Sequence, residues 1–413
     1  MELGGEVQLL ATVCKNCASH IIFDPKTQKV VCHTCGSSWD PQTVDVHEEF
    51  PDLQDFNEEN EDADEIYKHF MACKVYTCQS CGGEIFVHGS EASTNCIYCG
   101  NSSVIFSRIS KEKAPDFVLP FQTTPTDAVA SIRKAFKRHA FIPKEIRKIN
   151  PDMVRGIYIP YKIVNGRHFE AVNVCSHIRR GDRTETIHTK RSGFMQLRNL
   201  PVDASVILSD ESSQQLEPYD LNDMKPFNES YLLGFYSNAA DASDEMIQQA
   251  ANVRGINAFH SQVIKTVRGF DARVTRGEYE TYINKHAIMY ALFPVWFATF
   301  WYEGQHHTIL INAQTGKVVG GLPWDKKAVD RLTIALSILF TIFCGVVLFG
   351  FYKVMGKPAN FKEGLATLFM PVLSAVCGIG IWVMGKNKMK KVMKYIHLTQ
   401  DSSLFKFVKK RQG

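Results

Sequence analysis

The sequence predicts a multidomain protein with two small four-cysteine modules, a duplicated α+β domain and a C-terminal two-helix transmembrane hairpin. Three observations in the 413-residue chain lead to this prediction: a repeated cysteine spacing, a recurring strand–helix–hairpin pattern and two uncharged apolar stretches. The expected segments are a first cysteine module at 11–40, an acidic linker at 41–68, a second module at 69–110, the α+β domain at 111–325, the hairpin at 326–385 and a basic tail at 386–413.

The cysteine modules each contain two C-x-x-C pairs with the same spacing. The eight positions are Cys14, Cys17, Cys32 and Cys35, followed by Cys78, Cys81, Cys96 and Cys99. Four thiolates surround Zn²⁺ tetrahedrally, and a two-residue gap lets both sulfurs of one pair reach the same ion. The two apolar runs around Asp24-Pro25 predict a short hairpin between the first module's pairs. The pattern therefore predicts two zinc ribbons with one structural zinc ion each. The spacing alone leaves an iron–sulfur cluster open, because the ligands are the same.

The linker between the modules is strongly acidic. Residues 41–67 contain eleven carboxylates and no Lys or Arg. A segment with this much charge and so few clustered apolar residues does not pack alone. We therefore expect a mobile spacer that lets the two ribbons fold independently.

The α+β region contains a weak internal repeat. "LPFQTTPTDAVASIRKAF" and "LGFYSNAADASDEMIQQAA" share Leu-x-Phe, which aligns Phe121 with Phe235. Each stretch is followed by an aromatic strand with a proline, at Pro160 and Pro294. We predict two related halves, each with a strand, a helix and a hairpin, and place the first hairpin turn at Asn165-Gly166. Chance similarity of short strand–helix patterns is the alternative.

The C-terminal region predicts two membrane-spanning helices, at 332–352 and 365–385. Each stretch has 21 uncharged residues, about 31 Å as a helix against a hydrocarbon core of about 30 Å. Eight Lys or Arg residues flank the hairpin and three lie in its loop. This asymmetry places both termini in the cytoplasm of a multi-pass cell-membrane protein. The tail, with nine Lys or Arg against Asp401, predicts contact with anionic lipid.

The motif content argues against an enzyme with a small-molecule substrate. The sequence has no Walker phosphate loop, no H-E-x-x-H, no G-x-S-x-G and no dinucleotide fingerprint. Nucleic-acid binding is disfavoured because it needs a basic stripe. Residues 75–103 of the second module contain Glu84 and Glu91 but no Lys or Arg. Protein recognition by the ribbons is the favoured function class.

Several motifs together resemble the bacterial TFIIB-type zinc-ribbon membrane proteins. They are the paired cysteine modules, "LPVDAS" (200–205), "FPVW" from Phe293, "NAQTGKVVGGLPWDK" (312–326) and the terminal hairpin. The resemblance implies a non-enzymatic membrane anchor of phage-shock or envelope-stress systems that helps to place partner proteins at the membrane. The resulting hypothesis is a zinc-binding membrane scaffold whose cytoplasmic ribbons recruit a protein partner. The alternative is a membrane-tethered zinc-ribbon nucleic-acid-binding protein.

Overall fold

The protein is represented by a computed structural model that describes most of the cysteine modules, the α+β domain and one long C-terminal helix. The described residues are 13–44, 70–79, 82–87, 96, 104–137, 143–205, 208, 210–238, 240–302, 305–320, 326–355, 379–380, 382–384 and 387. Most of the acidic linker, most of the second apolar stretch and nearly all of the basic tail lie outside these residues.

The first cysteine module is a three-stranded antiparallel sheet followed by a short 3₁₀ helix. Its elements are β1 (Ile21–Asp24), β2 (Lys29–Cys32), β3 (Ser38–Trp39) and η1 (Pro41–Thr43). The Asp24 carboxylate accepts hydrogen bonds from the N–H groups of Lys26 and Thr27, at 3.2 Å each. These bonds close the turn between β1 and β2, so the hairpin expected around Asp24-Pro25 is present.

A sheet of twelve strands forms the centre of the molecule. The strands are β4 (Phe70–Cys78), β5 (Glu84–Val87), β6 (Val104–Lys113), β7 (Phe117–Val118), β8 (Val154–Arg180), β9 (Arg183–Asp203), β10 (Lys225–Pro226), β11 (Tyr236–Ser237), β12 (Phe270–Ile283), β13 (Met289–Tyr302), β14 (Gln305–Asn312) and β15 (Val318–Val319). Within the described residues, the α-helices are α2 (Pro125–Phe136), α3 (Asp210–Leu216), α4 (Asp244–Lys265) and α5 (Lys326–Met355), and the further 3₁₀ helices are η3 (Lys144–Lys148), η4 (Pro151–Met153), η5 (Leu221–Asp223), η6 (Glu229–Leu232) and η7 (Lys285–Ala287).

The antiparallel pair β8–β13 is buried on both faces. On one face, Leu292 of β13 belongs to an apolar cluster that includes Ile132 of α2. On the other face, Phe293 belongs to a second cluster that includes Leu216 of α3. This burial explains why β13, with the sequence MYALFPVWFATFWY, is almost continuously apolar.

The two halves of the α+β domain pair around β8–β13 in the same way. Strand β7 runs parallel to β13, and β11 runs parallel to β8. The N–H of Leu119 donates to Leu292 O at 2.9 Å, and the N–H of Asn238 donates to Tyr158 O at 3.1 Å. The first half has the order β7, α2 and hairpin β8–β9, whereas the second has β11, α4, the additional strand β12 and hairpin β13–β14.

The residues that are structurally equivalent in the two halves differ from those that the sequence repeat aligned. The helix caps Thr124 and Ser243 correspond to each other, as do Leu119 and Asn238. This correspondence lies five residues away from the alignment of Phe121 with Phe235. Those two rings instead stack on each other, with centroids 4.1 Å apart and planes 12° apart. The shared Leu-x-Phe matched by chance, because both phenylalanines fill the same core from different backbone positions.

The predicted turn at Asn165-Gly166 is wrong. These residues form a bulge inside β8, and the chain turns at Gly181, whose φ is +61°. Asn165 O accepts from the N–H of Asn284 at 2.9 Å, which ties the bulge to the chain after β12. A Cβ at Gly166 would lie 2.3 Å from Tyr282 O, so glycine permits a close approach of two strands. Tertiary pairing therefore overrode the local turn preference.

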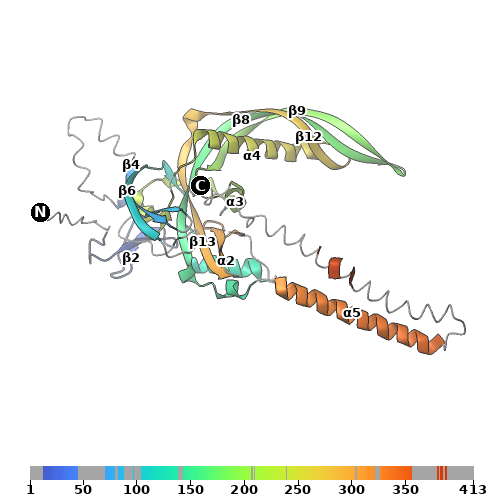
Figure 1. The fold of residues 1–413 in the computed structure, drawn as a ribbon. Helices are drawn as coiled ribbons and strands as arrows, with labels where there is room; N and C mark the ends of the chain where they lie inside the picture. Colours follow the sequence, from blue (N-terminus) through green and yellow to red (C-terminus); the bar gives the residue numbers. More distant parts are fainter. Residues whose placement is uncertain are drawn as a thin grey trace.

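Three strands extend beyond the body with one helix along them (Figure 1). We call this part the arm; it comprises β8 from Asn165, β9 up to Asn199, α4 and β12. Helix α4 lies on one face of the strands, where its Phe259 and Val263 pack against Val172 and Val174.

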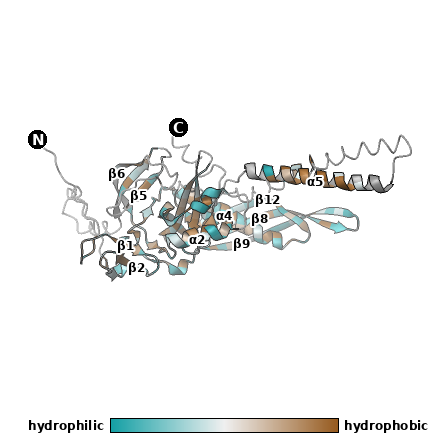
Figure 2. Ribbon diagram, turned by 90° about the horizontal axis from the view of Figure 1, so that it is seen from below, coloured by the Kyte–Doolittle hydropathy of each residue, from teal (hydrophilic) through white to brown (hydrophobic). Residues whose placement is uncertain are grey.

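Helix α5 extends away from the body, and much of its ribbon has the colour of hydrophobic residues (Figure 2). Its window Asp330–Val347 is long and apolar enough to cross a membrane, the one such helix within the described part of the chain. Leu339 and Phe343 are among its exposed side chains, at 62% and 65%. A two-helix hairpin is not established, because most of 365–385 falls outside the described residues.

Candidate metal centre

The four cysteines of the first module converge on one point. Their sulfur atoms all lie within 4.8 Å of one another. Cys14 Sγ is 3.4 Å from Cys35 Sγ, and Cys17 Sγ is 3.5 Å from Cys32 Sγ. A tetrahedron with metal–sulfur bonds of about 2.3 Å has edges of about 3.8 Å, whereas a disulfide needs about 2.05 Å. The four unbridged thiols therefore fit a closed four-thiolate metal site, consistent with zinc.

The two C-x-x-C pairs have equivalent backbone geometry. In the first pair, Cys14 N–H donates to Ser19 O and Ala18 N–H donates to Cys14 O, both at 2.8 Å. In the second pair, Gly36 N–H donates to Cys32 O at 2.9 Å. The residue after each pair has a positive φ, +55° at Ala18 and +75° at Gly36. Both pairs therefore lie in turns of the same kind, and Gly36 adopts the positive φ of the second turn without strain.

Two small polar residues support the sulfurs and were not identified from the sequence. Asn16 N–H donates to Cys14 Sγ at 3.4 Å, and its side-chain amide donates to Ser37 Oγ at 2.7 Å. Ser37 Oγ lies 3.1 Å from Cys35 Sγ. Asn16 therefore links the two halves of the site. Asn16 lies inside the first cysteine pair and Ser37 lies two residues after the second. Polar residues are too common at such places for the sequence alone to identify these two as supporting residues.

The surroundings lower the pKa of Cys35 and raise the pKa of Cys14. Hydrogen bonds from the side chain and backbone of Ser37 lower the pKa of Cys35 to about 6. Burial raises the pKa of the Cys14 thiol to about 11. A metal ligand must be a thiolate, so zinc binding displaces a proton from Cys14 at neutral pH, whereas Cys35 is already ionised.

The first module is built into the α+β domain. Phe23 of β1 is 1% exposed, and its ring centroid is 5.1 Å from that of Tyr231. Its N–H donates to Leu233 O at 3.1 Å. Ser230 Oγ donates to Pro41 O at 2.6 Å, so the beginning of the acidic linker is also attached to the domain. The apolar run in β1 predicted a hairpin strand but could not reveal what covers it.

The second module shows the same turn at its first cysteine. Cys78 N–H donates to Gly83 O at 3.0 Å, Gly82 N–H donates to Cys78 O at 2.8 Å, and Gly82 has a φ of +71°. Cys78 and Cys96 are both buried in one apolar cluster. Their predicted co-ligands, Cys81 and Cys99, lie outside the described residues. The structure thus shows one turn of this module but no complete ligand set.

Both modules dock on residues 228–238, which we call the platform. The first contacts it through Phe23, whereas the second adds β5 to β11, pairing Val87 with Tyr236. Phe23 enters the cluster that contains α2, and Val87 enters the cluster on the opposite face of the sheet. The expectation of two independent modules on a spacer is therefore corrected, because each buries apolar side chains in the domain's own core.

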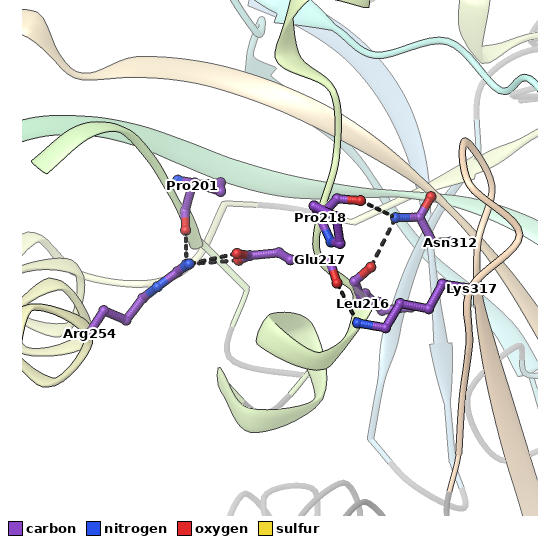
Figure 3. A network of polar contacts seen from close by, with 7 residues as sticks. All are labelled: Pro201, Leu216, Glu217, Pro218, Arg254, Asn312 and Lys317. Atoms are coloured by element: carbon purple, nitrogen blue, oxygen red, sulfur yellow. Dashed lines mark hydrogen bonds and ion pairs between the residues drawn. The ribbon is translucent and has the colours of Figure 1, made fainter. Parts of the chain in front are cut away.

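Residues of the motifs at 200–205 and 312–317 form a hydrogen-bond network around Glu217 (Figure 3). Arg254 of α4 donates to both carboxylate oxygens of Glu217, at 2.8 and 2.6 Å, and to Pro201 O. The Lys317 ammonium donates to Glu217 O. The Asn312 side-chain amide donates to the two carbonyls that flank Glu217, at 2.9 and 3.2 Å. The network fixes the segment after α3 between the two halves.

These two motifs occupy equivalent places in the two halves. Asp203 and Asn312 each end the returning strand of a hairpin, opposite Tyr161 and Val295 respectively. Each side-chain oxygen accepts from the N–H two residues further on, at 2.9 Å in both cases. The "QTGK" turn follows directly, with Gly316 at φ +72°. The motifs therefore belong to the architecture of the two hairpins.

Comparison with known proteins finds one relative, which is shorter than this chain. The chain is 27% identical over 332 residues to a Bacillus subtilis (strain 168) protein named "Uncharacterized protein YdjG". The match covers 78% of this chain and 92% of that protein. No family model matches the chain, and no solved structure matches it either.

Proposed function

We propose that the chain is a non-enzymatic, zinc-binding integral membrane scaffold whose cytoplasmic ribbons recruit a protein partner to the bilayer. The observation that carries the proposal is the closed four-thiolate set of the first module. A zinc ion with four protein ligands has no open position for substrate or water, so its role is structural. The resemblance to TFIIB-type zinc-ribbon membrane proteins supports a place in an envelope-stress response.

The second module holds a second structural zinc ion in this proposal. Its first turn repeats the hydrogen bonds and the positive φ of the first module. Cys78 and Cys96 come from separate pairs in the sequence and share one buried cluster. The repeated spacing supplies Cys81 and Cys99 as the remaining ligands.

The partner-binding surface is the exposed edge of the first ribbon. The face that carries Phe23 is occupied by the platform. Lys15 and Thr34, one in each cysteine pair, are both exposed and form this edge in the proposal. Helix α5 anchors the chain that carries this edge to the membrane, and the membrane topology expected from the basic flanks keeps the edge in the cytoplasm.

Fractionation of cells that express ribbon-edge variants tests the proposal. Lys15→Glu/Thr34→Glu changes the exposed edge and leaves all four cysteines in place. Lys26→Glu/Lys29→Glu on the hairpin of the same ribbon is the control, since both lysines are exposed. We expect a protein to move from membrane to cytosol with the edge variant and not with the control. If no protein moves and the full chain instead binds DNA with a steep salt dependence, nucleic-acid binding replaces the scaffold function.

A further inference from the structure

The arm has one covered face and one open face. On the covered face, Phe259 of α4 packs with Val172 and Val174 of β8. On the open face, Phe169 and Phe194 are cross-strand neighbours that are 44% and 66% exposed. Helix α4 lies between the arm's strands and α5 in both views, so α5 does not cover the open face (Figures 1 and 2). Residues paired directly across neighbouring strands point to the same face, so the strand register assigns further side chains to the open face.

The open face is aromatic near the body and basic towards its tip. Three exposed aromatic residues belong to its inner cross-strand rows, namely Phe169, Phe194 and Tyr282. Four basic residues belong to its outer rows, namely Lys190, Arg276, Arg273 and Arg179. The acidic residues of these paired rows, Glu278 and Glu280, both lie in the inner part. A positive surface therefore lies beyond an aromatic one on the same face.

The tip of the arm has a net positive charge. Residues 173–191 and 268–276 contain eight Lys or Arg and three Asp or Glu. All eight basic residues are exposed. The Arg179 guanidinium lies over the Phe270 ring, 5.6 Å from its centroid, and Phe270 is 47% exposed. The tip and the inner rows together suit an acidic partner that also carries apolar side chains.

The acidic linker of the same sequence has this complementary composition. Residues 45–57 contain five carboxylates together with Phe50, Leu53 and Phe56. Residues 58–65 contain six carboxylates and no Lys or Arg. A part with apolar side chains is thus followed by a part rich in carboxylates, just as the open face has an aromatic part followed by a basic one. Complementary charges steer two surfaces together and fix their register.

The linker of one chain does not reach the tip of the arm of that chain. Its ends are fixed at Val44 and Phe70 in the two cysteine modules, and the arm extends from the opposite end of the body in both views (Figures 1 and 2). The middle of residues 45–69 lies at most about 44 Å from either end, even in a fully extended chain. From Gly166 to Arg180 the arm itself spans about 46 Å, and the body lies between the two.

We infer that the open face of the arm binds the acidic linker of a second copy of this chain. The carboxylates of 58–65 meet the basic outer rows, and the apolar side chains of 45–57 meet the aromatic inner rows. The arm and the linker are different surfaces, so the contact is heterologous and each copy offers one arm and one linker to its neighbours. The chain therefore self-associates, and salt weakens the association because it screens exposed charges.

Capture of one tagged copy by another tests this inference. Two full-length preparations with different affinity tags are mixed in detergent micelles at high salt, dialysed to low salt and captured through one of the tags. We expect parent copies to capture each other at low salt and to separate again at high salt. Parent copies that do not associate, or that associate equally at both salt concentrations, would overturn the inference.

Two charge variants locate the contact. The arm variant, Lys190→Gln/Arg273→Gln/Arg276→Gln, changes the open face, and the linker variant, Glu58→Gln/Glu59→Gln/Glu61→Gln/Asp62→Asn, changes the linker. Each should bind its own kind about tenfold more weakly than the parent binds itself, because one exposed ion pair contributes roughly twofold to threefold in affinity. Self-association of either variant at the parent's affinity would contradict the assigned surfaces.

Each variant has a matched control. Lys134→Gln/Lys137→Gln/Lys144→Gln removes three exposed charges from the body. Glu58→Asp/Glu59→Asp/Glu61→Asp/Asp62→Glu keeps the charge of the linker. Both controls should associate like the parent, with the parent's zinc content in all four variants. A body control that loses association as strongly as the arm variant would overturn the inference.

A mixture of the arm variant with the linker variant is the most specific measurement. The linker variant keeps an intact arm and the arm variant keeps an intact linker, so the two should bind each other with close to the parent's affinity. A mixture that associates as weakly as each variant alone would overturn the inference. If duplex DNA binds the parent but not the arm variant, while parent copies do not associate, the open face binds nucleic acid and the inference is wrong.

Discussion

The two cysteine modules begin with the same turn but join the body in different ways. Cys14, Cys32 and Cys78 each accept a hydrogen bond from an N–H four residues later, at 2.8–2.9 Å. The first module then inserts an aromatic side chain, Phe23, whereas the second adds a strand to the central sheet. Local spacing therefore determines the metal turn, and the surrounding side chains determine how each module is attached.

The shared platform connects the two attachments. Residues 228–238 contact the first module at Leu233 and the second at Tyr236. A change in either module therefore reaches the same short segment and, through Phe235, the core between the two halves. A metal ion bound by the first module would therefore contribute to the stability of the whole body.

Removal of a first-module ligand should have the largest effect. Cys32→Ser leaves three thiolates, and metal binding supplies most of the folding free energy of so small a module. We expect the loss of one zinc equivalent and a body melting temperature lower by about 5–10 °C, since 1 kcal/mol corresponds to about 2–4 °C in a domain of this size.

Metal analysis and thermal unfolding of the purified chain check this prediction. Cys175→Ser is the matched control, because Cys175 is a buried thiol on the arm, outside both modules. An unchanged melting temperature of the body in Cys32→Ser would show that the ribbons fold independently of the body and would contradict this prediction.

The attachments can be weakened without touching a ligand. Phe23→Ala should cost about 3–5 kcal/mol and Ile85→Ala about 2–5 kcal/mol, because each removes a side chain no more than 1% exposed from a packed cluster. Both variants should keep their zinc. Denaturant unfolding gives the free energies, with Lys26→Ala on the exposed hairpin as a control. A negligible loss of unfolding free energy in Phe23→Ala would show that the first module does not depend on the packing of Phe23 against the platform.

The sequence predicted what is local and missed what depends on distant contacts. The cysteine spacing identified all four cysteines that converge in the first module, because two cysteine pairs joined by a short hairpin define the whole group. The docking of Phe23 was invisible, since its partners Tyr231 and Phe235 lie two hundred residues away in the chain. Asn165-Gly166 carried a strong turn signal, yet the pairing of β8 with β9 and β12 over many residues outweighed it.

A smaller effect concerns the pH at which zinc is released. The hydrogen bonds of Ser37 lower the pKa of Cys35 to about 6, so this thiol is largely ionised at neutral pH and becomes protonated as the pH falls through about 6. Ser37→Ala raises that pKa, and protons then compete with zinc at higher pH. We expect the release midpoint to rise by less than about one pH unit.

A chromogenic chelator added during an acid titration measures the midpoint. Ser19→Ala, at the corresponding place after the first cysteine pair, is the comparison variant, because hydrogen bonds of Ser19 also lower the pKa of Cys17. A midpoint that moves to lower pH in Ser37→Ala would contradict the assigned role of this hydroxyl.

The central claim is that two structural zinc ions hold the cysteine modules in the body. Metal analysis of full-length protein purified without added metal, combined with thermal unfolding before and after a strong chelator, tests it most directly. The account predicts two zinc equivalents per chain and a lower melting temperature of the α+β domain after chelation. One zinc equivalent, an iron–sulfur chromophore or a melting temperature that is unchanged after chelation would contradict it.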